Sequence, residues 1–210
     1  RGLGDVYKRQ DSESLLCKVG LIFSSHMESF KECRLAYSSM KSTYVYRPLI
    51  GESVAFTFFY DQQEVFLSYL GQEESYSFEA FTSFLSLIDL LFSPIYALGS
   101  VVELDSNLLP EDLVNQFRSH SIDLYALITG RRVLLEDSDY YVDYIGSVWP
   151  YGLQSEVPPL FFSNLNIQRL VYEGYTDSRD YTYSQEELRE QYLYSGYSSS
   201  LYAGGLKDEN

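Results

Sequence analysis

Cysteine and histidine are scarce in this sequence, with two residues of each among 210. Cys17 and Cys33 fall in one stretch of expected helix, sixteen positions apart, which is too far for a disulfide. Free thiols fit a reducing compartment and predict a cytoplasmic protein. Neither His26 nor His120 has cysteine or carboxylate neighbours at a ligand spacing, so we expect no metal site and no cofactor.

Basic residues are also few, because 15 lysines and arginines stand against 30 acidic residues, for a formal net charge of −15. An acidic surface repels nucleic acids and anionic membranes. It suits either basic protein partners or plain solvation, and the composition leaves both open. No apolar run reaches the roughly 18 residues of a membrane-spanning helix. The nearest candidate, Phe81–Phe92, contains Asp89, so we expect neither nucleic-acid binding nor membrane insertion.

Motifs of catalysis are missing as well. The sequence has no glycine-rich phosphate loop and no G-x-S-x-G nucleophile elbow. The acidic run of Glu136, Asp137, Asp139 and Asp143 lacks the spacing and the central glycine of a calcium loop, and it predicts an acidic hairpin turn. No carboxylate pair stands out among so many acidic residues. We therefore predict that the protein is not an enzyme.

Aromatic residues are plentiful, at 17% of a chain that is 45% hydrophobic, which predicts a folded and strand-rich protein. Within residues 11–94, Asp11–Tyr37 carries an apolar stripe at steps of three and four, which predicts one long helix. Three strand-like runs follow at short intervals, Thr43–Ile50, Ser53–Tyr60 and Glu64–Leu70. Ser77 then caps a helix that ends at Ser93-Pro94.

A second β-rich region, residues 95–180, begins after this helix. Its expected strands are Gly99–Leu104, Ile122–Thr129 with a turn at Gly130, Tyr140–Trp149 and Gln168–Glu173. A short helix starts at Pro110, and a capping box at Ser184–Glu187 opens a last helix within residues 181–210, before Gly196 and a flexible tail. Short connections predict antiparallel pairing and an α+β fold. The two halves either form separate subdomains that meet near Pro94 or share one sheet.

Aromatic residues gather near the predicted turns of the second region. Trp149, Pro150 and Tyr151 follow one strand, and Tyr175 follows another. Because aromatic residues are enriched at binding hot spots, we take these four as candidate partner contacts, with coverage of a sheet edge as the alternative. Gly146, inside a strand, predicts a bulge or a close backbone approach.

Several short motifs occur in order across Leu98–Asp177. They are Gly99-Ser100-Val101-Val102, Ile128-Thr129-Gly130-Arg131, Tyr144–Gly152 with Pro150 between, Phe161–Asn164, and Glu173-Gly174-Tyr175. With this order and spacing, the stretch resembles a bacterial family known as domain of unknown function 4176. Relative to that family, Asp105–Ser121 is an insertion. Separately, the first ten residues, RGLGDVYKRQ, resemble a translated sequencing adapter, as in a metagenomic reading frame.

The resemblance implies a gene neighbourhood and does not imply a catalytic reaction. Members of the family are similar to proteins encoded beside LXG-type toxins in type VII secretion loci of Gram-positive bacteria, where they are thought to act as accessory factors. The resemblance therefore implies a chaperone-like adaptor that binds the toxin or another protein of the locus. It points to no catalytic residues in this sequence. The alternatives are an immunity protein that neutralises such a toxin, and an uncharacterised enzyme or small-ligand binder.

Overall fold

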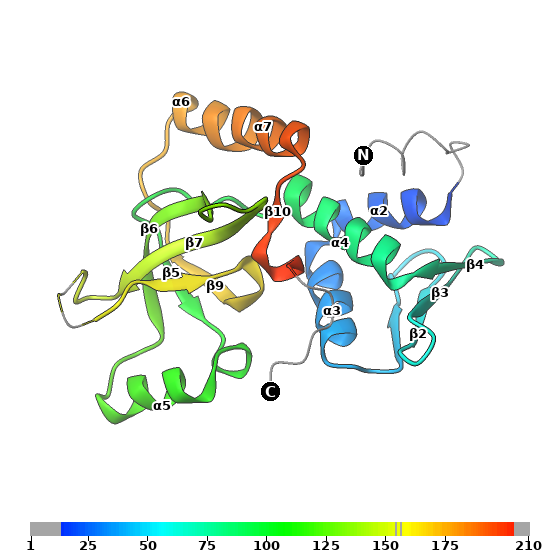
Figure 1. Cartoon of the computed structure of the whole chain (residues 1–210), viewed down its shortest axis with the longest axis horizontal. Coiled ribbons are helices and arrows are strands. Elements are labelled where there is room, and N and C mark those ends of the chain that lie inside the picture. Colours follow the sequence, from blue (N-terminus) through cyan, green and yellow to red (C-terminus); the bar gives the residue numbers. More distant parts are fainter. Residues whose placement is uncertain (1–13, 154, 156, 204–210) are drawn as a thin grey trace. The chain divides into compact units, whose positions relative to one another are not determined.

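The computed structural model describes residues 14–153, 155 and 157–203. The adapter-like first ten residues and the end of the tail lie outside this range. The chain divides into two compact units, one of residues 1–93 with 202–210 and one of residues 94–201. Each unit has its own sheet, so the alternative of one sheet shared by both halves does not hold. Both sheets are antiparallel apart from the two-residue β10, and helices pack on them (Figure 1), which confirms the α+β class.

The first unit has two helices, a four-stranded meander and a third helix. Its elements are α2 (Leu15–Ser25), α3 (Met27–Ser38), β1 (Thr43–Tyr46), β2 (Val54–Phe59), β3 (Glu64–Tyr69), β4 (Gln72–Ser77) and α4 (Phe78–Phe92). The prediction of one long helix was wrong, because His26 leaves helical geometry with φ −137° and ψ 66°. The prediction of three strands missed β4, a polar strand whose only cue is its pairing with β3.

Aromatic rings form the core of this unit. Phe56 lies 6.0 Å from Phe23 and 5.6 Å from Phe81, measured between ring centroids. Gly20 of α2 is buried, and a Cβ there would lie 3.2 Å from Ile88 Cδ1 of α4. The glycine that weakens α2 as an isolated helix therefore allows the close approach of α2 to α4.

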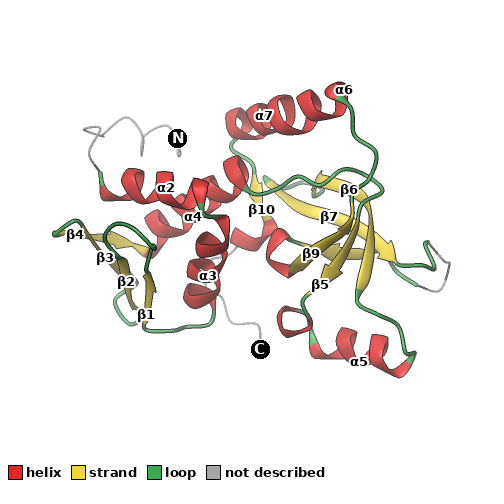
Figure 2. Cartoon of the chain, turned by 180° about the vertical axis from the view of Figure 1, so that it is seen from behind, coloured by secondary structure: helices red, strands yellow, loops and turns green. Residues whose placement is uncertain are grey.

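The second unit is a curved sheet with helices at its two sides (Figure 1, Figure 2). Its elements are β5 (Val101–Leu104), the 3-10 turn η1 (Ser106–Leu108), α5 (Glu111–Ser119), β6 (Tyr125–Leu134), β7 (Tyr140–Val148), β8 (Leu160–Phe162), the 3-10 turn η2 (Asn164–Asn166), β9 (Ile167–Tyr172), α6 (Ser178–Tyr181), the π-helix η3 (Thr182–Glu187), α7 (Leu188–Ser195) and β10 (Ser198–Ser199). A last 3-10 turn, η4 (Ser200–Tyr202), leads into the tail.

The strand order is β10-β7-β6-β5-β9, and β8 also pairs with β7. The chain passes from β8, which pairs with β7, to β9, which pairs with β5 at the far end of the strand path, through η2 alone. Because this connection is so short, the sheet curls to bring β8 and β9 close together. The buried residues of that core are Val102, Leu104, Phe117, Ala126, Ile128, Tyr144, Val148, Leu160, Phe162 and Ile167. Helix α5 contributes Phe117 and closes part of this inner face.

Two predicted boundaries in this unit were wrong. Strand β6 does not turn at Gly130 but passes it with a register shift and runs to Leu134. Glu136, Asp137 and Asp139 lie in the β6–β7 turn as expected. The prediction was wrong for Asp143, which is buried within β7 and accepts a hydrogen bond from Asn164 N at 2.9 Å. Ser184 opens no helix, because it is buried inside a helical segment that begins at Ser178. The cap is Asp177, whose carboxylate accepts a hydrogen bond from Asp180 N at 2.8 Å. Gly196 ends the segment at φ +72°, as predicted.

Candidate functional site

Tyr144 of β7 lies at the centre of a buried polar cluster. Its hydroxyl donates to Pro94 O at 2.8 Å, lies 3.1 Å from Asn164 Oδ1 and accepts from Tyr96 N at 3.2 Å. Its ring packs 5.5 Å from Phe162. Burial raises the pKa of this phenol, so the hydroxyl stays protonated and serves as a structural hydrogen-bond donor and acceptor. The cluster joins the start of the unit to β7 and to the turn after β8.

Two glycines mark places where backbone segments touch. At Gly174 an added Cβ would lie 2.2 Å from Leu98 O and 2.8 Å from Ser100 N, and Gly174 N donates to Ser100 Oγ at 2.9 Å. At Gly146 it would lie 2.7 Å from Leu127 O. The close approach predicted for Gly146 is therefore confirmed, and Gly174 is a second such position. Only glycine fits where main chains approach this closely.

The motifs behind the family resemblance thus meet in space, and each has a folding role. Tyr144 and Asn164 come from two of these motifs and contact each other. Gly174 and Ser100 come from two others and also contact each other. These contacts tie distant segments of the second unit together, so the four residues have a structural role.

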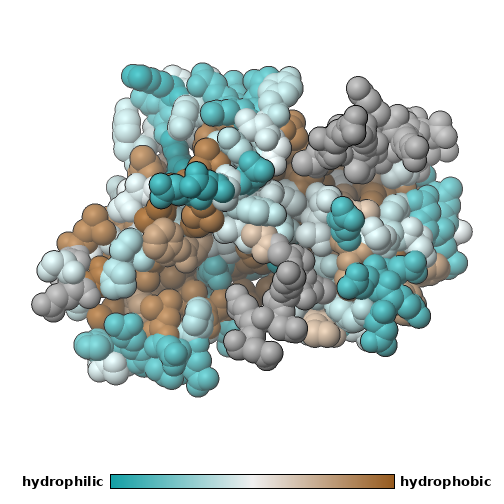
Figure 3. All heavy atoms as spheres, viewed as in Figure 1, coloured by the Kyte–Doolittle hydropathy of each residue, from teal (hydrophilic) through white to brown (hydrophobic). Residues whose placement is uncertain are grey.

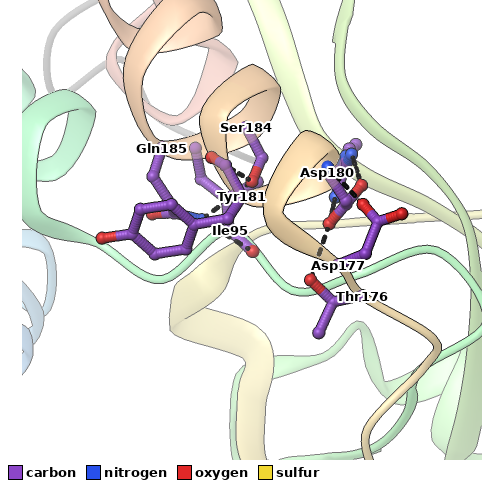
Figure 4. A network of polar contacts seen from close by, with 8 residues as sticks. Ile95, Thr176, Asp177, Asp180, Tyr181, Ser184 and Gln185 are labelled. Atoms are coloured by element: carbon purple, nitrogen blue, oxygen red, sulfur yellow. Dashed lines mark hydrogen bonds and ion pairs between the residues drawn. The ribbon is translucent and has the colours of Figure 1, made fainter.

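A further motif residue, Arg131 of β6, holds the C-terminal helical segment. Its guanidinium contacts both carboxylate oxygens of Asp180, at 2.5 and 3.3 Å, and Thr176 Oγ1 donates to the same carboxylate at 3.2 Å. The hydrogen bond from Arg131 lowers the pKa of Asp180. One turn later Gln185 donates to Ile95 O at 3.3 Å (Figure 4). The segment is thereby docked through polar contacts on two successive turns.

An open hollow of about 690 Å³ lies beside this docking point. It is lined by Asp177, Ser178, Arg179, Asp180, Thr182, Tyr183 and Glu187. Asp180 is already engaged by Arg131, and Asp177 caps the helix. Those two carboxylates therefore serve the fold.

The face of the second sheet that points away from its core carries several exposed apolar side chains. Alternation along each strand places Leu127, Ile145 and Phe161 opposite the core side chains that neighbour them. Register sets Leu127 beside Val101, and Val101 beside Tyr172. We call Leu127, Ile145, Phe161, Tyr172 and Trp149 the outer surface. Figure 3 shows apolar atoms gathered over the strands between α5 and the α6–α7 segment.

Phe161 and Tyr172 are its most exposed members, at 60% and 66% relative accessibility of the residue, with Trp149 also exposed. Leu127 and Ile145 are half-buried between them. Across the same sheet, Arg169 of β9 forms an ion pair with Glu103 of β5, with Nε and Oε2 2.6 Å apart. A charged edge thus borders an apolar centre, which is the general arrangement of protein interfaces.

The four residues expected as partner contacts are all exposed, but they do not form one cluster. Trp149, Pro150 and Tyr151 lie in the turn after β7, where Trp149 N donates to Tyr125 O at 2.9 Å. Tyr175 lies beyond the other end of β5, next to Gly174. Phe161 and Tyr172 were not predicted from the sequence as candidate contacts. Phe161 could have been found, because consecutive residues of a strand point to opposite faces and Phe162 is apolar enough to be the buried one.

In the part of the chain that the structure describes, no group of three or more histidine, cysteine or acidic side chains is placed to hold a metal ion. Within the same range, no helix combines the length and apolar character required to cross a membrane.

Comparison with known proteins gives one match. No curated protein and no solved structure matches the chain. The matching segment, residues 120–183, begins just after α5 and covers β6 to the π-helix, including Arg131, Tyr144, Gly174 and Asp180. It lies within the second unit, and over these residues the chain is similar to the family described as Domain of unknown function (DUF4176).

Proposed function

We propose that this is a non-enzymatic accessory protein that acts by binding another protein, and that the outer surface of the second sheet is its contact surface. The observation that carries the proposal is the exposure of Phe161 beside the half-buried Ile145, and of Tyr172 two strands away from the half-buried Leu127. Exposed aromatic rings next to partly buried aliphatic residues are the kind of side chains that anchor an interaction hot spot.

Charge supports a protein partner over other large ligands. With a net charge of −15, the chain repels phosphate backbones and anionic lipid headgroups. The Arg169–Glu103 pair beside the outer surface offers one donor and one acceptor for a polar rim. A partner with an apolar patch and a basic margin fits these features best.

We further propose that the partner is an LXG-type toxin or another protein of a type VII secretion locus, met in the cytoplasm. The support is the similarity of residues 120–183 to the DUF4176 family together with the setting implied by that resemblance. The adaptor role predicts binding to the export region of the toxin rather than to its toxic domain.

Co-expression of the tagged full chain with neighbouring genes of its locus tests the proposal. A stable complex is expected, and Phe161→Asp with Tyr172→Asp should abolish it, because two charges would be buried in an apolar contact. Tyr194→Asp is the matched control, since Tyr194 is an exposed tyrosine of α7 that is not part of the outer surface as defined above. If no neighbour-encoded protein binds, or if the control weakens the complex equally, the proposed function fails.

A second candidate, an immunity protein, is favoured by the acidity of the chain. Complementary charge steers acidic inhibitors to basic toxins and makes their association rates fall with salt. This candidate predicts binding to the toxic C-terminal domain and protection of cells that express it. Recovery with the export region and no protection would decide against it.

The enzyme or ligand-binding alternative rests on the open hollow beside Asp180. It predicts that a small molecule accompanies the purified protein or raises its melting temperature. Mass spectrometry of the denatured protein tests this directly, and we propose that no stoichiometric metabolite will be found.

A further inference from the structure

The first unit exposes aliphatic side chains at the tips of two hairpins. Leu49 and Ile50, in the β1–β2 turn, are as exposed as in an unfolded chain, at 105% and 94%. Leu70, in the β3–β4 turn, is half-exposed. Single exposed aliphatic residues are common on protein surfaces, whereas contiguous exposed apolar surface marks interaction sites, and Leu49 and Ile50 are adjacent.

The meander brings both tips to the same end of the sheet. The last pair of the first hairpin is Tyr46 with Val54, and that of the second is Tyr69 with Gln72. Because β2 and β3 are neighbours, the two turns project side by side, about 10 Å apart for two strand spacings. We call Leu49, Ile50 and Leu70 the hairpin end.

The first tip is presented by an anchored hairpin. Tyr44 of β1 donates its hydroxyl to Ser29 O of α3 at 2.9 Å, and the hydroxyl also lies 3.0 Å from Glu32 Oε2. The ring of Tyr46 packs 5.7 Å from that of His26. Helix α3 therefore holds β1 in place. Because the hairpin is already ordered in the folded chain, a partner that binds its tip does not have to order it, and less conformational entropy is lost on binding.

The charges around the first tip are self-complementary. Arg47 precedes Leu49 and Glu52 follows Ile50, and both are exposed. In an isologous two-fold contact the same patch meets itself, so Arg47 of one copy can face Glu52 of the other. The first tip thus carries one charge of each sign on a chain that carries −15, while the nearest acidic residues after the second tip are Glu73 and Glu74. Two copies that meet at the first tip can therefore pair opposite charges there.

We propose that the hairpin end is a self-association surface, through which two copies of this chain form a weak two-fold dimer. Three aliphatic residues per copy cover less than the roughly 800 Å² per partner of a standard stable interface, so the dimer is reversible. Since each copy carries a net charge of −15, added salt screens the repulsion between the two bodies and strengthens association. This inference is independent of the proposed function, which concerns the other unit.

Sedimentation velocity of the full chain, from about 5 to about 500 µM, tests the proposal in the range of a weak interface. A monomer–dimer equilibrium that shifts to dimer with salt is expected. The double variant Leu49→Ser with Ile50→Ser should weaken association at least about tenfold, because the buried apolar area is lost. The matched control is Leu134→Ser with Leu135→Ser, a pair of exposed leucines at the β6–β7 hairpin of the other unit.

Charge reversal gives a second test that keeps the aliphatic residues in place. Arg47→Glu should weaken the dimer, and Glu52→Arg added to it should restore association, because the pairing between copies is re-formed with reversed signs. A monomer at every concentration and salt overturns the proposal. So does a dimer that survives loss of Leu49 and Ile50, a control that dissociates equally, or a monomer that binds phosphatidylcholine vesicles through this tip.

Discussion

Tyr144→Phe tests whether the polar cluster at the centre of the second unit stabilises its closure. The substitution removes one oxygen and leaves the ring, which is buried at 1% exposure and packed on Phe162, in place. The hydroxyl accepts from Tyr96 N and donates to Pro94 O or Asn164 Oδ1. Two hydrogen bonds are therefore lost at once, in a site that the larger tyrosine had filled.

The expected cost follows from those two contacts. A buried donor or acceptor left without its partner costs about 1–3 kcal/mol, and solvent can relieve part of this at the half-buried Tyr96 and Asn164. We expect a loss of about 2–4 kcal/mol in the free energy of unfolding of the second unit. Tyr194→Phe, at an exposed tyrosine, should cost under about 0.5 kcal/mol.

The single tryptophan makes the assay specific. Trp149 lies in the second unit, so its fluorescence during urea unfolding reports on that unit while the first contributes none. The midpoint should fall with an unchanged slope for Tyr144→Phe and stay in place for Tyr194→Phe. Equal midpoints for the two variants would show that the cluster adds nothing to stability, and our reading of the family-like motifs would then be wrong.

Further tests concern other contacts of the fold. Gly174→Ala should destabilise the second unit by at least about 1–3 kcal/mol by the same fluorescence assay, since its Cβ would meet backbone atoms within 3 Å; a neutral result would contradict the close approach. Folding lowers the pKa of Asp180, so its contribution to stability is present above the pKa of the unfolded chain, near 3.8, and is lost as pH falls through the pKa of the folded protein. Asp180→Asn should reduce stability at neutral pH. In melts measured at several pH values, the variant should also lose less stability on acidification than the parent protein does. Burial raises the pKa of Cys33, so in the native protein a thiol reagent should label Cys17 first and Cys33 only on unfolding, as mass spectrometry would show.

Much of the secondary structure could be predicted, because local signals set it. The α4 helix follows from the Ser77 cap, which accepts from Ala80 N, and from the stop at Ser93-Pro94. Strand β2 follows from its period-two pattern. The failures have equally physical causes. β4 has no apolar pattern and exists because β3 offers it a partner, and the break at His26 lies within an uninterrupted apolar stripe.

The candidate sites were harder to predict, because they depend on what becomes covered. Trp149 and Tyr175 were both expected as partner contacts near predicted turns, and the sheet places them at opposite ends of β5. Phe161 was visible as an aromatic residue, yet only its pairing with Ile145 on the side away from the core shows that it contributes to a surface.

By itself the sequence determined the α+β class, the acidic character of the chain, and the resemblance carried by short motifs around Gly130, Tyr144 and Gly174. These depend on composition, periodicity and the residue type required at a given backbone position, all of which are local. The tertiary structure alone decided that those motifs meet and close a curled sheet, and that Phe161, Tyr172, Leu49 and Ile50 remain exposed. The reason is that exposure and closure are set by contacts between residues far apart in the chain, which no local pattern records.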